Sequence, residues 1–520
     1  MNPVEPHRLF NIQDIVDEII GHLVVSNTGD DNPDYPTPPS RSDLLSAALS
    51  CRAFSEPCLD LLWRHLPSIW PVIYLLPLSF PATDKEPCHL LEKVTTEDWD
   101  HIRSYLNRVQ SLFFRHDKEL HRSVFSCIFT LLQDQPFLPS LRRLHWEFHN
   151  SGTSESLIFI SPSLRRVRVR WRVMHPPNNP NGTRPKRPID HLGVFLVALA
   201  EYSPQLSELK FDDEVRPGVS SLIARFRQLT SLNLSCDGFK FTPEMFRSIS
   251  HFPNLTTLDI RTEGLATTFG LGVGSFQALE SLTLGGKIPR IVDLLPSFSS
   301  SPLVRLAIYC VDQDCKFVFC RPLFTMVARF FASSLLRLSA FFPISRPQSY
   351  DEDNQETFHL MTFLDPILSI KQIHSIVIRF PTSGAYLPLS LSDDDVGRMA
   401  TSWPNIRKLH LRLLRSESDI APTLQTLSTL AKQCPSLFDL SLCINATNSH
   451  SYLEDLTPLR TLRYLDLSGS DTTWDVAADV ARVVHFLFPD LIEFVAWARK
   501  GIMVGPWNRV LDEARLLRQV

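Results

Sequence analysis

Short hydrophobic segments with one spacing recur along most of the chain. In one of them, Leu255, Leu258 and Ile260 follow the turn residues Phe252-Pro253-Asn254, and a single polar residue separates the last two apolar positions. Alternation of this kind predicts a short β-strand with one buried face. Thirteen other segments have the same spacing, and they begin at Val109, Leu141, Leu164, Leu206, Leu229, Leu279, Leu303, Leu335, Ile373, Ile406, Leu437, Leu462 and Leu491.

The distance between these segments predicts how they are arranged. Neighbouring copies are mostly 23 to 33 residues apart, and the four from Leu229 to Leu303 are the most evenly spaced. A period of this length is typical of stacked repeats, in which each unit buries its apolar face against its neighbours. The L-x-x-L-x-L pattern resembles that of leucine-rich repeats, and Leu437–Asn445 extends it to L-x-x-L-x-L-x-x-N. Most other copies lack the asparagine, so we expect an irregular coil.

Segments with helical periodicity alternate with the predicted strands. Thr242-Pro243-Glu244 is a helix start signal, and Ser392 with Asp395 has the spacing of a capping box. Strands and helices joined with one hand build a parallel sheet. The expected fold class is therefore α/β: a leucine-rich-repeat solenoid over residues 109–505, forming an α/β horseshoe with its parallel sheet on the concave face, and a C-terminal cap helix over 506–520. Helices are expected at Glu119–Leu132, Ile189–Tyr202, Pro243–Ser250, Leu323–Ala332, Ala421–Lys432 and Asp475–Phe488.

Residues 9–66 do not follow the repeat and predict three helices. Residues 12–23, IQDIVDEIIGHL, are similar to the opening L-P-x-E-I-x-x-x-I-x-x-x-L helix of the F-box family, with Gln13 in place of the proline. Residues 43–54, DLLSAALSCRAF, are similar to its L-x-x-x-x-x-V-C-[KR]-x-[FW] block, and Trp63 stands at the position of its late tryptophan. Residues 66–73 and 95–109 also resemble fungal F-box proteins with leucine-rich-repeat tails. The chain is thus expected to carry an F-box over 9–66, and a linker with an N-terminal cap helix over 67–108.

This resemblance implies a function that needs no catalytic residue. F-box helices bind the Skp-type adaptor of a cullin–RING (SCF-type) ubiquitin ligase, and the repeats capture a target protein. A repeat scaffold or inhibitor without a ligase is the alternative, in which residues 9–66 only cap the first repeat. The adaptor-binding residues expected from the resemblance are Ile12, Ile15, Val16, Ile19, Leu44, Leu45, Leu49, Phe54 and Trp63.

Composition narrows the partners and the compartment. The net charge is 52 − 56 = −4, so neither nucleic acid nor an anionic membrane is an expected partner. No apolar run reaches the 18 residues of a membrane-spanning helix. The ten cysteines are scattered, mostly within apolar runs, as buried thiols are in a reducing compartment. A cytoplasmic and/or nuclear protein is expected.

No catalytic or metal-binding motif is found. Gly270-Leu271-Gly272-Val273-Gly274 lacks the continuation of a dinucleotide-binding fingerprint and is better explained as a turn. Cys310, Cys315 and Cys320 are five residues apart, which is not a usual zinc-ligand spacing. We therefore expect neither an enzyme, nor a cofactor, nor a metal site.

Basic residues are the candidates for target binding. Arg166, Arg168 and Arg170 alternate with Val167 and Val169, so all three are expected on the open face of one strand. Arginine suits carboxylate and phosphate partners, which predicts an acidic or phosphorylated target. The alternative is a solvated strand that neighbouring carboxylates neutralise: Glu147, Glu208 and Asp212. The remaining target-binding candidates are Arg143 and Lys210 beside this row, and a second row of Lys408, His410 and Arg412, for which lone solvated charges are the alternative.

Overall fold

A computed structural model gives the structure of the chain. It describes residues 13–23, 41–76, 78–79, 89–90, 94–115, 120, 122–132, 135–148, 154–171, 191–212, 221–235, 242–262, 275–311, 319–343, 358–380, 389–412, 421–447, 456–496 and 505–517. The chain divides into two compact units, Met1–Leu229 and Thr230–Val520, and each is described by itself.

The first unit begins with three helices that share a small core. These are α1 (Gln13–Leu23), α2 (Arg41–Ser50) and α3 (Arg52–Arg64), called here the N-terminal helical module. Val16, Ile20, Leu44 and Cys58 are buried together at its centre. Pro57 lies within α3, beyond the first turn, where proline is best tolerated.

A parallel sheet follows the module in the same unit. Its strands run in the order β1 (His65–Leu66), β4 (Ser111–Arg115), β5 (Arg143–Phe148), β6 (Arg166–Trp171) and β7 (Glu208–Phe211). The sheet thus begins at His65, well before the predicted start at residue 109, because β1 pairs with β4. The connecting elements are α4 (Trp70–Ile73), β2 (Leu78–Ser79), β3 (His89–Leu90), α5 (Thr96–Leu106), α6 (Arg122–Leu132), η2 (Ser154–Phe159) and α7 (His191–Tyr202).

The second unit repeats strand and helix along a parallel sheet. Its strands run in the order β8 (Ser231–Leu234), β9 (Thr257–Arg261), β10 (Ser281–Gly286), β11 (Arg305–Cys310), β12 (Arg337–Phe341), β14 (Ser375–Arg379), β16 (Lys408–Arg412), β17 (Asp439–Leu442), β19 (Tyr464–Asp466) and β21 (Glu493–Val495). The helices are α9 (Pro243–Ser250), α10 (Ile288–Leu294), η3 (Leu295–Phe298), α11 (Cys320–Phe331), α12 (Met361–Leu364), η5 (Asp365–Ser369), α13 (Asp393–Ser402), α14 (Leu424–Gln433), α15 (Ala477–Leu487) and α16 (Pro506–Leu517). Two small parallel pairs flank this sheet: β13 (Phe358–His359) with β15 (Leu389–Ser390), and β18 (Asn445–Ala446) with β20 (Asp471–Thr472).

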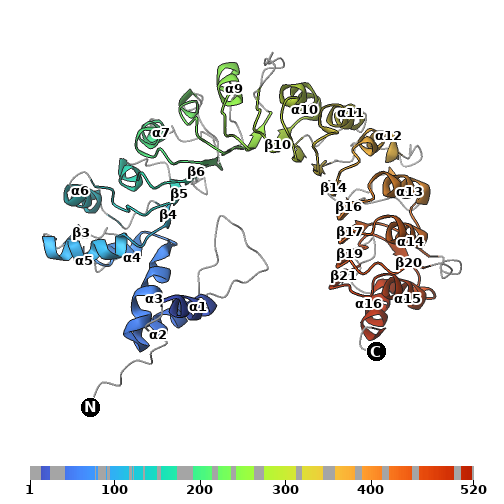
Figure 1. Cartoon of the computed structure of the whole chain (residues 1–520), viewed down its shortest axis with the longest axis horizontal. Coiled ribbons are helices and arrows are strands. Elements are labelled where there is room, and N and C mark those ends of the chain that lie inside the picture. The colour runs from blue at the N-terminus through green and yellow to red at the C-terminus, as the bar shows by residue number, and fades with distance from the viewer. Residues whose placement is uncertain are drawn as a thin grey trace, which may run out of the picture. The chain divides into compact units, whose positions relative to one another are not determined.

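One face of each sheet is buried and the other is open. In β9 the side chains alternate, with Leu258 and Ile260 buried and their neighbours only partly covered. In the second unit the helices α10, α11, α13 and α14 all lie on one side of the strands (Figure 1). The opposite side, called here the open face, carries the polar positions of the strands. The fold is therefore α/β and solenoid-like, as expected from the repeat pattern.

Most local predictions are confirmed. Each of the fourteen hydrophobic segments forms a strand in the predicted place, and the six predicted helices are present with ends shifted by at most three residues. Ser392 and Asp395 make the predicted capping box, in which each side chain bonds to the other's backbone N–H. Thr242 caps α9 by accepting a hydrogen bond from the Met245 N–H at 3.2 Å.

Candidate functional site

The predicted adaptor-binding residues of the N-terminal helical module differ in burial: some form its core and others lie on its surface. Val16 and Leu44 are fully buried, so they hold the module together and are not available to an adaptor. Ile15, Phe54 and Trp63 are partly buried, and Ile12 lies outside the described residues. The exposed members are Ile19, Leu45 and Leu49, at 40%, 52% and 79% exposure.

Leu45 and Leu49 form an exposed apolar pair on α2. They are four residues apart, so they lie on the same side of the helix. Leu44, one residue earlier, points instead into the module core with Val16. These two leucines are not among the residues that form the module core.

Two contacts attach α3 to the last turn of α5 and to Arg108, which follows it. The Trp63 ring packs on Tyr105 with centroids 4.9 Å apart. Arg108 pairs with Asp60 and donates a 2.5 Å hydrogen bond to Glu56. Burial opposes the charge on Arg108, but the two carboxylates outweigh it and raise its pKa. Trp63 therefore helps to join the module to the rest of the unit, and its role in adaptor binding stays a prediction.

The arginine row on β6 is largely neutralised within the sheet. Arg166 Nε lies 3.0 Å from Glu208 Oε2, and Arg168 Nε lies 2.5 Å from Asp212 Oδ2. Both carboxylates come from β7 or the residue after it, as the alternative interpretation proposed. The expectation of an unneutralised row is therefore wrong for Arg166 and Arg168, since an occupied guanidinium has less to offer a target.

The other members of that row are placed differently. Arg170 is exposed and pairs in register with Glu147 on β5, and Arg143 lies in register between Ser111 and Arg166. Lys210 lies opposite Arg168 and has a partner of its own. Target binding by Arg143, Arg170 and Lys210 stays a prediction.

His145 lies among these charges on β5. Its side chain is 8% exposed, packs edge-on against Phe113, and stands in register with Arg168. Burial, followed by the positive charge of Arg168, lowers the pKa of His145 to about 4. The imidazole is therefore neutral in the folded chain at pH 7.

Acidification is expected to destabilise the first unit through His145. In the unfolded chain its pKa is about 6.5, so protons bind the unfolded state more readily below that value. Stability should fall as the pH drops from about 6.5 towards 4, by about 2 kcal/mol between pH 7 and 5. Urea unfolding of the chain and of a His145→Gln variant at both pH values would measure the difference, which isolates this residue from other titrating groups. An equal loss of stability in both proteins would contradict the assignment.

The second predicted basic row is also paired. Lys408 Nζ and His410 Nε2 each lie 2.6 Å from an oxygen of Asp439 on the neighbouring strand β17. Burial opposes ionisation of Asp439, but the hydrogen bonds from His410 and Lys408 outweigh it and lower its pKa. Lys408 and His410 are therefore neither lone charges nor an open anion site. The Arg412 side chain lies outside the described residues. The target-binding role proposed for Lys408 and His410 therefore loses its basis.

A different set of open-face residues remains unpaired. On β11, β12 and β14 the open face carries Arg305, Tyr309, Arg337, Phe341 and Arg379, called here the arginine–aromatic patch. Arg305 pairs in register with Arg337, and Tyr309, Phe341 and Arg379 form a second register row. The two aromatic rings are 6.2 Å apart. Within the part of the chain that the structure describes, none of the three guanidinium groups has a hydrogen bond or ion pair.

The sequence contained a signal for this patch. Each strand segment begins or ends with an arginine and holds no carboxylate: RLAIYC, RLSAF and SIVIR. The density of basic residues is higher on β6, whose segment RVRVRW holds three arginines. Arg305 and Arg337 occupy the same position in consecutive copies of the repeat, which predicts that they lie side by side in a parallel sheet.

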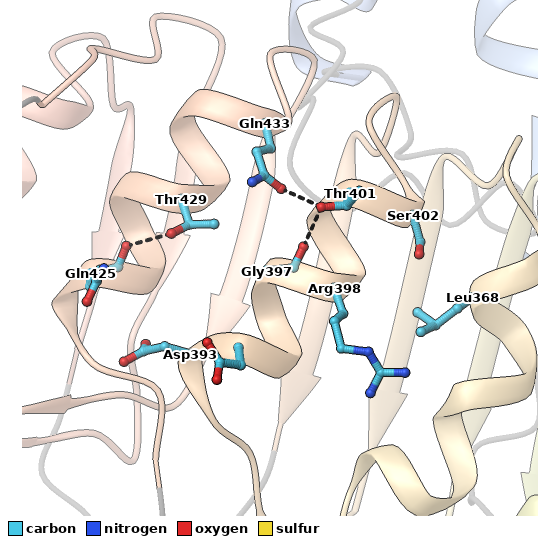
Figure 2. Close-up of a pocket in the computed structure, with 10 residues that line it drawn as sticks. Leu368, Asp393, Gly397, Arg398, Thr401, Ser402, Gln425, Thr429 and Gln433 are labelled. Carbon is cyan, nitrogen blue, oxygen red and sulfur yellow. Dashed lines mark hydrogen bonds between the residues drawn. The ribbon is translucent and has the colours of Figure 1, made fainter.

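A polar groove on the helix side of the second unit carries no comparable feature. It has a volume of about 730 Å³ and lies between α13 and α14. Its polar side chains bond to the molecule itself: Thr401 donates to the Gly397 carbonyl and to Gln433, as Figure 2 shows, and Arg398 pairs with Asp365. Thr401 and Arg398 are thus engaged within the molecule.

Metal and membrane features can be stated for the described residues. No group of three or more His, Cys, Asp or Glu side chains among them could hold a metal ion. Cys310 and Cys320 are buried, and Cys315 lies outside the described residues. None of the described helices is both long enough and apolar enough to cross a bilayer.

Comparison with known proteins does not assign the chain to a family. No protein-family model matches the chain, and no curated protein matches it. The structure alone defines an α/β protein with a solenoid-like parallel sheet and an N-terminal helical module. Its two candidate surfaces are the exposed leucines of that module and the arginine–aromatic patch.

Proposed function

We propose that the chain is a non-catalytic substrate receptor of a cullin–RING ubiquitin ligase. The N-terminal helical module, read as an F-box, binds a Skp-type adaptor, and the repeats hold a target protein. The observation that carries this proposal is the exposed apolar pair Leu45 and Leu49 on a module whose own core is complete. Neighbouring exposed apolar side chains can mark a protein contact, and this pair lies in the segment that resembles the F-box.

The mechanism requires no bond-making residue on the chain. A receptor that holds adaptor and target together raises the effective concentration of a target lysine near the ubiquitin-loaded enzyme. The attachment of α3 through Trp63 and Arg108 supports this, because it couples the module to α5 and the region that follows it in the same unit. A loosely tethered module would position a target less well.

The test is direct binding of the full chain to a purified Skp-type adaptor. Changing Leu45 and Leu49 together to Asp should weaken binding by about a hundredfold or more, because two carboxylates would lose water against an apolar partner. The matched control changes Phe129 and Leu516 to Asp; these lie on α6 and α16 and are similarly exposed, at 62% and 59%. The control should bind as the unchanged chain does.

The outcomes separate the site from the function. Equal binding by the Leu45/Leu49 variant and the control would place the contact elsewhere on the module. If the unchanged chain binds no Skp-type adaptor, the ligase proposal is wrong, and a repeat scaffold or inhibitor becomes the better interpretation.

A further inference from the structure

The arginine–aromatic patch carries positive charges that no described carboxylate neutralises. Arg305 and Arg337 occupy register-paired positions on adjacent parallel strands, about 4.8 Å apart at the backbone. Like charges placed directly opposite each other destabilise a sheet. No described carboxylate pairs with either side chain, in contrast to Arg166 and Arg168 on β6. The pair therefore favours binding of an anion.

A second positive position lies at the other end of the strands. Arg379 is level with Tyr309 and Phe341, four residues beyond the level of Arg305 and Arg337. At about 3.3 Å per residue, this places the two positive levels about 13 Å apart along the strands. An extended peptide has the same rise, so acidic side chains four residues apart would reach both levels.

The surface between the two levels suits an apolar side chain. Its floor consists of Ala307, Ser339 and Val377, which are partly exposed, and the Tyr309 and Phe341 rings border it. Tyrosine, phenylalanine and arginine are enriched in the centres of protein interfaces. In an extended peptide the residues i, i+2 and i+4 all point to one side, so the middle one would face this floor.

From this arrangement we propose that the patch binds an extended acidic peptide of a partner protein. The peptide carries acidic residues at positions i and i+4 and an apolar residue at i+2. The first acid binds between Arg305 and Arg337, the second binds Arg379, and the apolar side chain lies against Tyr309 and Phe341. The inference rests on the proposed function in naming what the repeats hold.

A nucleic acid fits the same surface less well, although arginine and aromatic rings can also bind bases. Carboxylates lie two strands away from the patch on each side of the open face. Asp259 on β9 accepts a 2.8 Å hydrogen bond from Asn233, and Asp439 is held by Lys408 and His410. A polyanion that crossed the sheet beyond the neighbouring strands β10 and β16 would meet these carboxylates, whereas a short acidic segment that follows the three strands would not.

The test measures binding of the full chain to the fluorescent peptide Gly-Ser-Glu-Thr-Leu-Thr-Glu-Ser-Gly. Binding should exceed that of the same peptide with both Glu changed to Gln, and that of a peptide whose acids are three residues apart. It should also weaken as salt rises, since salt screens exposed charges. The measurement is repeated in a chain carrying Asp351→Asn, Glu352→Gln and Asp353→Asn, so that acids between β12 and β13 cannot compete.

Matched variants locate the site. Changing Arg305 and Arg337 to Ser should weaken binding about tenfold or more, while the chain melts at the same or a higher temperature because a repulsion is removed. Arg166→Ser, at an ion-paired position on β6, should leave binding unchanged. Phe341→Ser should abolish the preference for Leu over Ser at the middle position of the peptide.

Three results would overturn the inference. The first is equal binding of the Glu and Gln peptides, both by the unchanged chain and by the chain with residues 351–353 replaced. The second is that Arg166→Ser weakens binding as much as the change of Arg305 and Arg337 does. The third is tighter binding of a fluorescent oligouridylate than of the peptide. None of these measurements includes the adaptor, so failure of the peptide site and failure of the ligase proposal are distinguishable.

Discussion

Replacing Leu44 with Asp is expected to unfold the N-terminal helical module without changing the thermal transition of the second unit. Leu44 is fully buried and packs with Val16, Ile20 and Cys58. Placing a carboxylate there without a partner costs several kcal/mol. A module of three short helices has little stability to lose, because whole domains are stable by only about 5–15 kcal/mol.

Hydrogen exchange of α1, α2 and α3 in the full chain would measure this effect. The matched control is Leu45→Asp, one residue away but half exposed, which should keep native protection. Native protection in the Leu44→Asp chain would show that Leu44 is not a core residue. The comparison also separates two ways of losing an adaptor, since Leu44→Asp removes the module and Leu45→Asp removes only a contact.

The strands could be predicted from the sequence because their signal is local. Leu255, Leu258 and Ile260 are close in sequence, and the alternation that buries Leu258 and Ile260 needs no knowledge of distant residues. Helix starts such as Ser392 with Asp395 are local in the same sense. These features were therefore placed correctly.

The site could be predicted only in part, because ion pairs and sheet edges depend on distant residues. Alternation correctly placed Arg166 and Arg168 on one face, but Glu208 and Asp212 reach them only through the register of β6 with β7. A charge row therefore looks free in the sequence when it is paired in the fold. Conversely, β11 and β12 each hold a single arginine, and only the register of the sheet shows that the two form a pair of like charges.

The first strand was missed for the same reason. Strand β1 consists only of His65 and Leu66 and directly follows helix α3, so no hydrophobic periodicity marks it in the sequence. Their pairing with Ser111 and Leu112 on β4 defines them as a strand. The solenoid-like sheet consequently begins within the segment that the sequence assigned to the helical module.

A fragment beginning at Thr95 is therefore expected to misfold or aggregate, whereas one beginning at His65 should stay soluble. The shorter fragment lacks β1, which covers the edge of β4, and loses the buried residues Leu66, Ile69, Val72 and Ile73. At about 1.5–3 kcal/mol for each buried side chain, the loss is about 6–12 kcal/mol, comparable to the whole stability of a typical domain.

Removing β1 also leaves β4 as an open edge, which invites pairing between copies of the chain. Size-exclusion chromatography and thermal unfolding of fragments 95–520 and 65–520 would compare the two directly. The longer fragment lacks the module helices but keeps β1, so it controls for the loss of α1, α2 and α3. If both fragments are monomeric and melt alike, the helix Thr96–Leu106 suffices to cap the sheet, and β1 is dispensable.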